Sequence, residues 1–488
     1  MPKALPVLVR CSSSALMKMM KIRGEDAPPW ITPVRKVMIA LSAFLASAAF
    51  APIAVWYLGV IGYSIFLRKI AKSHRQLWHA FAFGFIYNAI VLHWSGKFVG
   101  AVPWLLLSFL QGLFYIPVGA VAKRWGSIWL TIGALLLMEE FRSVFPFGGF
   151  GWVRIAYTQA DAPFSKIAAI GGASALSALS VVCALIIFYG ATGKFSFITF
   201  APFLLLLVPV NLATASATNV LMIQGNVPQM GLDFNSRAKA VFNNHLQRTQ
   251  EELTKDSNVD FVLWPENSVD VDPFTNKDVK QALDNVEKPL IIGAIVSKGN
   301  KLLNTSILWG GELPPTYVKQ HLTPFGEYIP LRSLASKISP YTDQVTDFEP
   351  GQSQVLFTIK DAVIAPIICF ELVDDQLLHE AAVSANILAV QTNSATFGMS
   401  AESAQQLSIT RVRAIEHGRN IVSVSTTGYS AVINSDGKVL QKSSMGTAET
   451  IRAEVELLEG TTPRDAAGDW ALVGVLFVLF MVARRAYV

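Results

Sequence analysis

A succession of apolar segments in the first half of the chain constrains its fold most. A bilayer core needs roughly 20 apolar residues to be crossed by a helix. Two of the candidate spans, 37–50 and 126–141, are short. Because Pro52 marks a tight turn between the spans 37–50 and 52–67, six spans are an alternative to seven. With 52% hydrophobic and 15% charged residues, against about 25% charged in soluble proteins, the chain falls in the membrane class. The seven candidate spans cover residues 37–50, 52–67, 77–95, 101–121, 126–141, 164–190 and 195–211.

Basic residues between these segments predict an orientation, because cytoplasmic loops are enriched in Lys and Arg. Residues 1–36 are basic and precede a series of apolar spans without a convincing cleavage site, so we expect a retained cytoplasmic tail rather than a signal peptide. The loops predicted on the same, cytoplasmic side contain Arg68, Lys69, Lys72, Arg75, Lys123, Arg124 and Lys194. The loops predicted on the other side contain only Lys97, Arg142 and Arg154.

An odd number of spans puts the segment after Val210 outside the cytoplasm. A last span at 470–484 returns the chain, and Arg484 and Arg485 then lie inside. The sequence therefore predicts a polytopic helical domain over 37–211, a large extracytoplasmic domain over 218–462, and eight spans with both ends cytoplasmic.

The segment 218–462 alternates between predicted strands and helices. A helix is expected from Ser400 to Gly418, and Asp436-Gly437 predicts a hairpin turn. This alternation over some 245 residues predicts one α/β domain. The expected strands lie at 220–223, 261–264, 290–295, 306–309, 363–368, 387–390, 421–424, 429–433 and 438–440.

Three reactive side chains stand where apolar runs end. Cys369 follows the run 363–368, Glu266 follows 261–264, and Lys319 lies in a half-apolar run. A carboxylate, an ammonium group and a thiol suffice for acyl transfer through a thioester, with Glu as base, Cys as nucleophile and Lys with a backbone N–H on the oxyanion. Taken singly, each has a plain structural explanation: a packed cysteine, a solvated carboxylate, an edge-strand charge.

Other polar residues have simpler explanations. Glu327 sits in a turn with two prolines and suits a cap, Arg411 and Arg413 suit ion pairs, and His321 and His417 lack a metal partner at useful spacing. Cys11 and Cys183 lie in the tail and in an apolar span, where a packing or incidental role is the simplest one. The chain has no disulfide framework and no metal motif. A net charge of +5 without a basic, aromatic-rich run argues against nucleic-acid binding.

The combination resembles a known family. Trp264-Pro265-Glu266, then Lys319 with the run 321–327, then Ile368-Cys369-Phe370-Glu371, look like the Glu-Lys-Cys triad of the nitrilase, or carbon–nitrogen hydrolase, superfamily. With the spans before and after, the chain resembles the bacterial apolipoprotein N-acyltransferases, in an actinobacterial-like form. Further support comes from the runs 224–229, 145–146, 151–159 and 414–419.

The resemblance implies an αββα sandwich on the outer face of the bacterial cytoplasmic membrane. It implies that Cys369 takes an acyl chain from a phospholipid and passes it to the α-amino group of a diacylglyceryl-cysteine at a lipoprotein N-terminus. Glu266 would be the base, and Lys319 with the Phe370 N–H would hold the oxyanion. Glu327 would tune the triad and Glu371 would orient the pocket. No cofactor or metal is implied, and we expect a monomer.

The sequence departs from the family pattern at three places. Phe370 replaces a frequent Tyr, the stretch Asn393–Thr396 stands where an Asp and a Trp are common, and Asp233-Phe234 stands near the usual position of a loop Trp. These changes bear on lipid gating and acyl preference. Two alternatives keep the same triad or fold: a membrane-tethered amidase that uses water as acceptor, and a non-catalytic paralogue.

Overall fold

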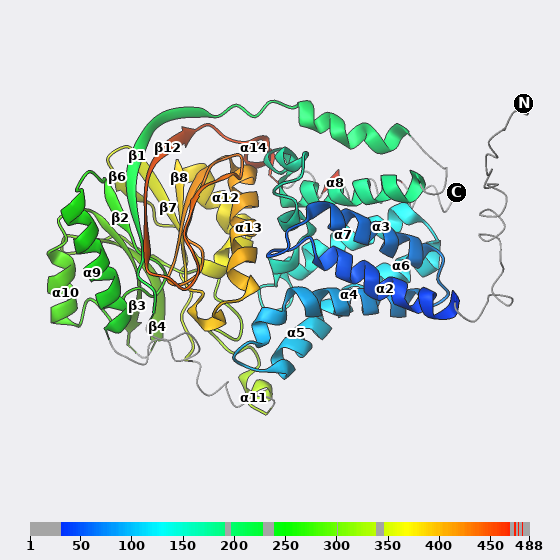
Figure 1. Ribbon diagram of the computed structural model, residues 1–488, viewed down its shortest axis with the longest axis horizontal. Helices are drawn as coiled ribbons and strands as arrows, with labels where there is room; N and C mark the ends of the chain where they lie inside the picture. Colours follow the sequence, from blue (N-terminus) through cyan, green and yellow to red (C-terminus); the bar gives the residue numbers. More distant parts are fainter. Residues whose placement is uncertain are drawn as a thin grey trace, which may run out of the picture.

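The apolar segments fold into a helical domain that forms one half of the molecule, and two β-sheets form the other half (Figure 1). The computed structural model describes residues 31–190, 197–227, 239–299, 301–337 and 346–468, together with 473, 474, 477 and 481. The tail up to residue 30, the Asp233-Phe234 loop and nearly all of the expected span 470–484 lie outside the described residues.

Each expected span before residue 211 overlaps a helical element. The stretches Ala101–Trp125 and Ser165–Gly190 are long and apolar enough to cross a membrane by length and composition; among the other described helices, Val37–Ser47 is a shorter apolar one. Residues 197–207 form a 3-10 helix. The α-helices are α2 (Ile31–Ser47), α3 (Trp56–Ala71), α4 (Gln76–Val91), α5 (Ala101–Leu113), α6 (Ile116–Trp125), α7 (Ile128–Val144) and α8 (Ala168–Gly190).

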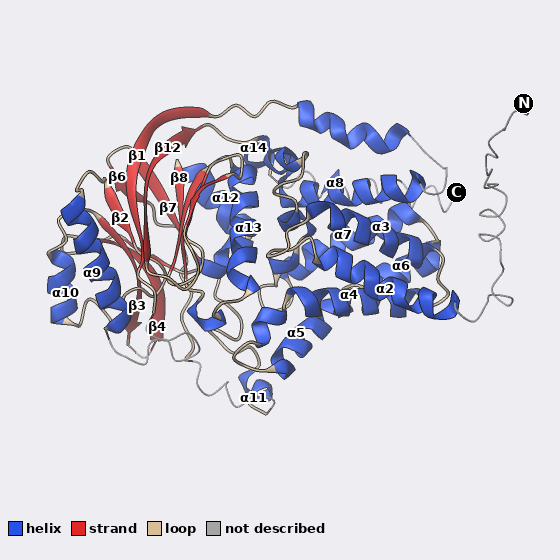
Figure 2. Cartoon of the chain, viewed as in Figure 1, coloured by secondary structure: helices blue, strands red, loops and turns tan. Residues whose placement is uncertain are grey.

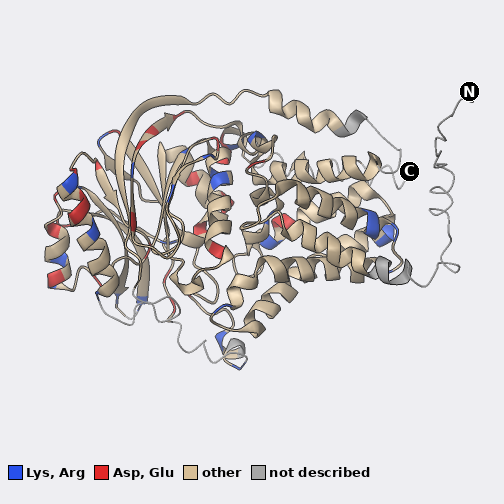
Figure 3. Cartoon of the chain, viewed as in Figure 1, with Lys and Arg blue, Asp and Glu red and all other residues tan. Residues whose placement is uncertain are grey.

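Large apolar side chains cover much of the outer surface of the helical domain. Charged residues are sparse along its helices and gather at their ends, as at Arg68 and Lys69 on α3 and Lys123 and Arg124 on α6 (Figure 3). Exposed apolar residues that gather on one part of a protein mark contact with a membrane or a partner. Examples exposed by more than two fifths are Leu41, Phe44, Trp78, Val102, Leu106 and Phe109.

The strands in the described part of the chain form two six-stranded sheets. The first has the order β12 (Glu449–Glu459), β1 (Ala213–Gln224), β2 (Phe261–Leu263), β3 (Leu290–Lys298), β4 (Lys301–Trp309), β5 (Thr316–Val318). The second has the order β11 (Val439–Lys442), β10 (Ala431–Ile433), β9 (Asn420–Ser425), β8 (Ile387–Thr392), β7 (Ala362–Ile368), β6 (Phe357–Ile359).

The sheets stack face to face, with helices outside each (Figure 2). Strand periodicity explains this: on β1, Val220 and Met222 point into the core between the sheets, while Leu221 and Ile223 pack under the outer helices. Helices α9 (Ala240–Lys255) and α10 (Lys277–Asp284) cover the first sheet, and α12 (Asp375–Ser384) and α13 (Ala401–His417) cover the second. This is the αββα sandwich that the resemblance implied.

The layer of α12 and α13 lies between the second sheet and the helical domain (Figure 1). One continuous apolar core runs from the helical domain, through residues such as Leu176, to Ile409 and Val412 on α13 and Val390 on β8. The expected helix from Ser400 to Gly418 is present: the Ser400 side chain caps its first turn, and Gly418 ends it in a left-handed conformation.

The carboxyl ends of the parallel strands in both sheets meet at one edge. Strands β1, β2 and β3 run parallel, as do β7, β8 and β9. The Asn226 N–H after β1 donates to the Thr426 carbonyl after β9 at 3.0 Å. The Gln391 amide on β8 donates to the Trp264 carbonyl after β2 at 2.7 Å. Residues that follow β2 and β7 are therefore brought together although the sequence separates them widely.

Candidate active site

Glu266, Lys319 and Cys369 meet at this shared edge. Each follows the end of a strand: Glu266 follows β2, Lys319 is the first residue after β5, and Cys369 is the first after β7. The Lys319 Nζ lies 3.4 Å from the Glu266 Oε1, and Glu266 lies close enough to the Cys369 thiol for hydrogen bonding between them to lower the pKa of Glu266 in part. Lys319 and Glu266 are 1% and 5% exposed, so this cluster of ionisable groups is buried.

A glycine on the neighbouring strand allows Glu266 to reach this position. A Cβ atom at Gly293 on β3 would stand 2.3 Å from the Pro265 carbonyl oxygen and 2.7 Å from the Glu266 Cα. Only a residue without a side chain lets the turn after β2 lie this close to the strand. The Val269 N–H then donates to the Gly293 carbonyl at 3.0 Å, which fixes the turn beside β3.

The backbone at Cys369 is unusual. Its φ of 52° lies in the left-handed region, which non-glycine residues adopt rarely and mostly where function constrains them. The residue begins a short 3-10 turn, Cys369–Val373, so the chain bends sharply as β7 ends. The half-buried thiol stands at this bend, and the Gln406 side-chain amide on α13 donates to its Sγ at 3.7 Å.

Two further residues complete the cluster around Lys319. The Glu327 Oε2 forms an ion pair with the Lys319 Nζ at 2.8 Å. The Asn304 side-chain amide on β4 donates to Glu266 at 2.8 Å and to Glu327 at 2.6 Å, so it links the two carboxylates. The turn around Glu327 that suggested a cap from sequence thus brings a second carboxylate to the lysine.

Burial and charge shift the ionisation of this group. Burial raises the pKa of Glu266 despite the nearby Lys319 ammonium group. Burial opposes the charge on Lys319, but the Glu327 and Glu266 carboxylates more than offset it, so the pKa of Lys319 is raised. Glu327 is also buried, yet its ion pair with Lys319 keeps its pKa low. The lysine therefore stays cationic, as an oxyanion partner must.

The thiol is protonated in the resting site. Burial, reinforced by the Glu266 carboxylate, holds the pKa of Cys369 well above its usual range, and Lys319 only partly opposes this. Cysteine attacks carbonyl carbon as the thiolate. A base must therefore remove the proton as the reaction proceeds, and Glu266 is the carboxylate in contact with it.

Glu371 ties the lysine segment to the cysteine segment. Its Oε1 accepts from the Tyr317 hydroxyl and the Gln320 N–H, each at 2.7 Å, and its Oε2 accepts from the Ile368 N–H at 2.7 Å. The carboxylate is fully buried, and burial raises its pKa to about 7. Since Ile368 precedes Cys369 and Gln320 follows Lys319, one side chain fixes the spacing of the two reactive groups.

The Phe370 ring faces the helical domain. It stacks on Phe150 with ring centroids 5.9 Å apart and on Trp152 at 6.4 Å, and the His321 ring meets it edge-on at 5.3 Å. The hydroxyl that a tyrosine would carry here is absent, so the contact is purely apolar. At another departure from the family pattern, the Asn393 Oδ1 accepts from the Thr426 hydroxyl at 2.9 Å and stabilises the strand ends.

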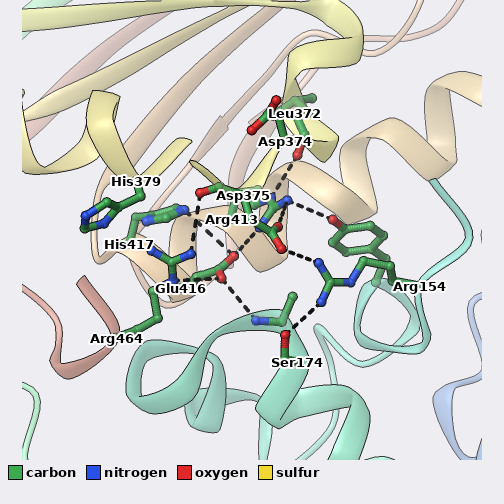
Figure 4. A network of polar contacts seen from close by, with 12 residues as sticks. Arg154, Ser174, Leu372, Asp374, Asp375, His379, Arg413, Glu416, His417 and Arg464 are labelled. Atoms are coloured by element: carbon green, nitrogen blue, oxygen red, sulfur yellow. Dashed lines mark hydrogen bonds and ion pairs between the residues drawn. The ribbon is translucent and has the colours of Figure 1, made fainter. Parts of the chain in front are cut away.

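A buried network of ion pairs docks α12 and α13 on the helical domain (Figure 4). Arg413 lies at its centre: it donates to the Leu372 carbonyl at 2.8 Å, to Asp375 at 2.6 Å and to Glu416 at 2.5 Å. Arg154 of the helical domain pairs with the other oxygen of Asp375 at 2.5 Å. Because Leu372 belongs to the turn that Cys369 begins, this network also supports the nucleophile.

Gly172 lets the two domains approach at the same network. Its φ of 74° interrupts α8, and a Cβ there would stand 2.9 Å from the Glu416 Oε1. The Ala173 N–H donates to that oxygen at 3.1 Å. Backbone from the helical domain is thereby bonded directly to α13.

The remaining residues singled out in the sequence have structural partners. Arg411 pairs with Asp161 at 2.5 Å, His417 contacts Asp465 at 3.0 Å, and the His321 Nδ1 contacts Asp374 at 2.8 Å. Within the described residues no cluster of three or more His, Cys, Asp or Glu suits a metal ion.

An open pocket of about 710 Å³ lies beside the site, between the two domains. Phe147 and Gly148 of the helical domain line one part, and Gln320, His321 and Asp374 line another. It adjoins the segment after Lys319 but Cys369 is not among its lining residues, so we assign it no role in the chemistry.

Three side chains in or beside the site were not predicted from the sequence. Asn304 begins the polar stretch Asn304-Thr305-Ser306 between the apolar residues of β4, and that interruption was the available signal. Gln406 and Glu402 lie on α13, where polar residues usually face solvent, and only the tertiary structure shows that both are buried, at 4% and 2% exposed.

Comparison with known proteins agrees with this architecture. Residues 42–186 match the family model of the apolipoprotein N-acyltransferase N-terminal domain, and residues 228–462 match that of carbon-nitrogen hydrolase. The apolipoprotein N-acyltransferase of Mycolicibacterium smegmatis is 31% identical over 89% of this chain and 82% of that protein. The enzyme of the same name from Azotobacter vinelandii is 27% identical, over 95% of this chain and 98% of its own length. That from Vibrio parahaemolyticus is 25% identical over 92% and 96%.

Proposed function

Because the chain belongs to the apolipoprotein N-acyltransferase family of the carbon–nitrogen hydrolase superfamily, we propose that it acylates lipoproteins through a thioester on Cys369. The donor is a membrane phospholipid, and the acceptor is the α-amino group of an N-terminal diacylglyceryl-cysteine. The observation that carries the proposal is the buried contact of Glu266 with both Lys319 and the Cys369 thiol.

In the first half-reaction, Glu266 takes the thiol proton while the sulfur attacks the ester carbonyl of the phospholipid. Lys319 and the Phe370 N–H hold the oxyanion of the tetrahedral intermediate. The C–O bond breaks, the leaving lysophospholipid takes the proton from Glu266, and the acyl chain stays on sulfur. Glu327 keeps Lys319 cationic, and Glu371 keeps it at a fixed distance from the thiol.

In the second half-reaction, the amine of the acceptor attacks the thioester. A C–N bond forms, the C–S bond breaks, and Glu266 transfers a proton from nitrogen to the departing sulfur. The thioester intermediate serves this two-lipid reaction because one lipid can leave before the other enters.

We also propose the topology in which this chemistry faces the extracytoplasmic side of the bacterial cytoplasmic membrane. Eight spans, both ends inside and a domain over 218–462 outside follow from the distribution of basic residues. Support comes from the basic ends of α3 and α6, which lie at the end of the helical domain remote from the sheets (Figure 3).

The test is intact mass spectrometry of the purified protein after incubation with a phospholipid, with Cys369→Ala in parallel. We expect a gain of one acyl chain on the wild type, none on the variant, and discharge when a diacylglyceryl lipopeptide with a free amino terminus is added. An adduct discharged equally by water would indicate an amidase-type hydrolase, and no adduct would indicate a non-catalytic paralogue. Either result contradicts the proposal.

A further inference from the structure

Glu402 is a buried carboxylate that the triad does not use. It lies on the first turn of α13 and is 2% exposed. Its Oε2 is buried and has no hydrogen-bond partner among the described residues. A negative charge suits the N-terminal turn of a helix, but this does not explain burial without a partner, which costs free energy. Such an atom in a native protein calls for a ligand or a reaction.

The position of Glu402 connects it to the thiol. Gln406 lies one turn further along α13 and donates to the Cys369 Sγ at 3.7 Å. Residues four apart share one face of a helix, so Glu402 faces the same space. Its charge acts on the cysteine, since the Glu402 carboxylate contributes to the raised pKa of Cys369. Burial raises the pKa of Glu402, hydrogen bonding to Ser394 opposes the rise, and the Glu266 carboxylate adds to it.

The charges around this space do not balance. Lys319 is the cation within ion-pair distance of Glu266 and Glu327, and Glu402 adds a third negative charge once it is ionised, above about pH 7. Lys97 of the helical domain comes near the start of α13, but its Nζ donates to the Met399 carbonyl at 2.9 Å. The surplus negative charge favours entry of a cation, and it disfavours the thiolate. Glu402 is therefore suited to the half-reaction that follows acylation of the thiol.

We propose that Glu402 binds the α-ammonium group of the acceptor and takes its first proton, an inference that rests on the proposed function. The ammonium group then becomes an amine and attacks the thioester carbonyl. Glu266 takes the second proton from nitrogen and passes it to sulfur as the C–S bond breaks. The products are an amide, a free thiol and one proton on Glu402, which returns to water when the product leaves.

The experiment separates the two half-reactions in the full-length protein. Wild type, Glu402→Gln and the control Glu380→Gln, an exposed carboxylate on α12, are first incubated with phospholipid, and the acyl-enzyme is measured by intact mass. A diacylglyceryl lipopeptide with a free amino terminus is then added at several concentrations. In a parallel sample the acyl-enzyme is discharged with hydroxylamine, a small nucleophile that is uncharged at neutral pH.

We expect Glu402→Gln to form the acyl-enzyme at least as fast as the wild type, because the variant loses a charge that disfavours the thiolate, and this result also shows that it folds. Its discharge by lipopeptide should slow by about tenfold or more, with a raised KM, as expected for loss of a charge-assisted contact. Its discharge by hydroxylamine should be unchanged, and Glu380→Gln should match the wild type throughout.

Three results would overturn the inference: unchanged discharge by lipopeptide, equal slowing with hydroxylamine, or failure of Glu402→Gln to form an acyl-enzyme that the wild type forms. If the wild type itself forms no acyl-enzyme, the proposed function fails instead, so the two failures are distinguishable.

Discussion

At the scale of single residues, the site is a set of ionisable groups whose burial decides their charge. Glu327 is buried but keeps a low pKa because it pairs with Lys319 at 2.8 Å, whereas Glu402 has no ion-pair partner among the described residues and burial raises its pKa to about 7. The same type of side chain thus has different protonation states within one site. This difference is measurable without any substrate.

Glu402 should make folding stability depend on pH. An unfolded Glu releases its proton near pH 4.3, while the folded protein holds the Glu402 proton up to about pH 7. The protonated carboxyl therefore contributes stability below about pH 4.3, and that contribution is lost as the pH rises to about 7. Relative to the wild type, Glu402→Gln should gain roughly 3 kcal/mol of unfolding free energy between these limits.

The measurement is the Tm of both proteins at pH 5 and pH 8 in one detergent. The Tm of Glu402→Gln minus the Tm of the wild type should be larger at pH 8 than at pH 5. Parallel Tm curves would show that Glu402 is ionised in the folded protein at both pH values.

At the scale of elements, α13 joins the site to the helical domain. Its Gln406 contacts the thiol, and its Arg413 and Glu416 belong to the buried network that reaches Arg154 (Figure 4). Removing one member of a buried ion pair is costly because its partner stays charged and unpaired. Arg411 on the same helix, whose partner Asp161 is exposed, provides the matched comparison.

Arg413→Met should lower the free energy of unfolding by about 3–5 kcal/mol, because Asp375 and Glu416 lose a buried cation. Arg411→Met should cost about 1 kcal/mol or less, because its partner Asp161 is 58% exposed. Thermal unfolding of both variants in the same detergent compares them. Equal losses of unfolding free energy would show that the buried ion pairs of Arg413 stabilise the protein no more than the pair of Arg411 with Asp161.

The sequence predicted most of the elements that carry the site, and it missed those with weaker patterns. The strand ends before Glu266 and Cys369 were visible because an apolar run stops at a polar residue. The edge strands β6 and β12 were missed: β6 is short, and the alternation of Ile451, Ala453, Val455 and Leu457 on β12 is masked by charged residues between them. The roles of Asn304 and Gln406 depend on contacts between distant strands and helices, which local patterns do not encode.

At the scale of the whole molecule, the distribution of charge and exposed apolar surface divides the protein along its long axis (Figure 3). The helical domain is apolar outside, with basic helix ends remote from the sheets, and the sheet domain carries most of the surface charge. This division underlies the proposed topology, in which the two parts face different environments.

Cysteine labelling tests that topology. In a background with Cys11, Cys183 and Cys369 replaced by Ser, Lys280→Cys on α10 should react with a membrane-impermeant maleimide in intact spheroplasts. Lys72→Cys, after α3, should react only when the membrane is opened, because basic loops stay in the cytoplasm. Reaction at Lys72→Cys in intact spheroplasts, or protection of Lys280→Cys, would contradict the orientation.

The position of α13 determines where a substrate meets the thiol. Gln406, beside the thiol, and Arg413, in the network against the helical domain, lie on one continuous helix, seven residues or about 10 Å apart at 1.5 Å per residue. Helix α13 lies between the second sheet and the helical domain, so its contacts fix the position of the thiol relative to the helical domain (Figure 1). In the proposed reaction, both lipid substrates must therefore come to a thiol whose position against the helical domain is fixed by one helix.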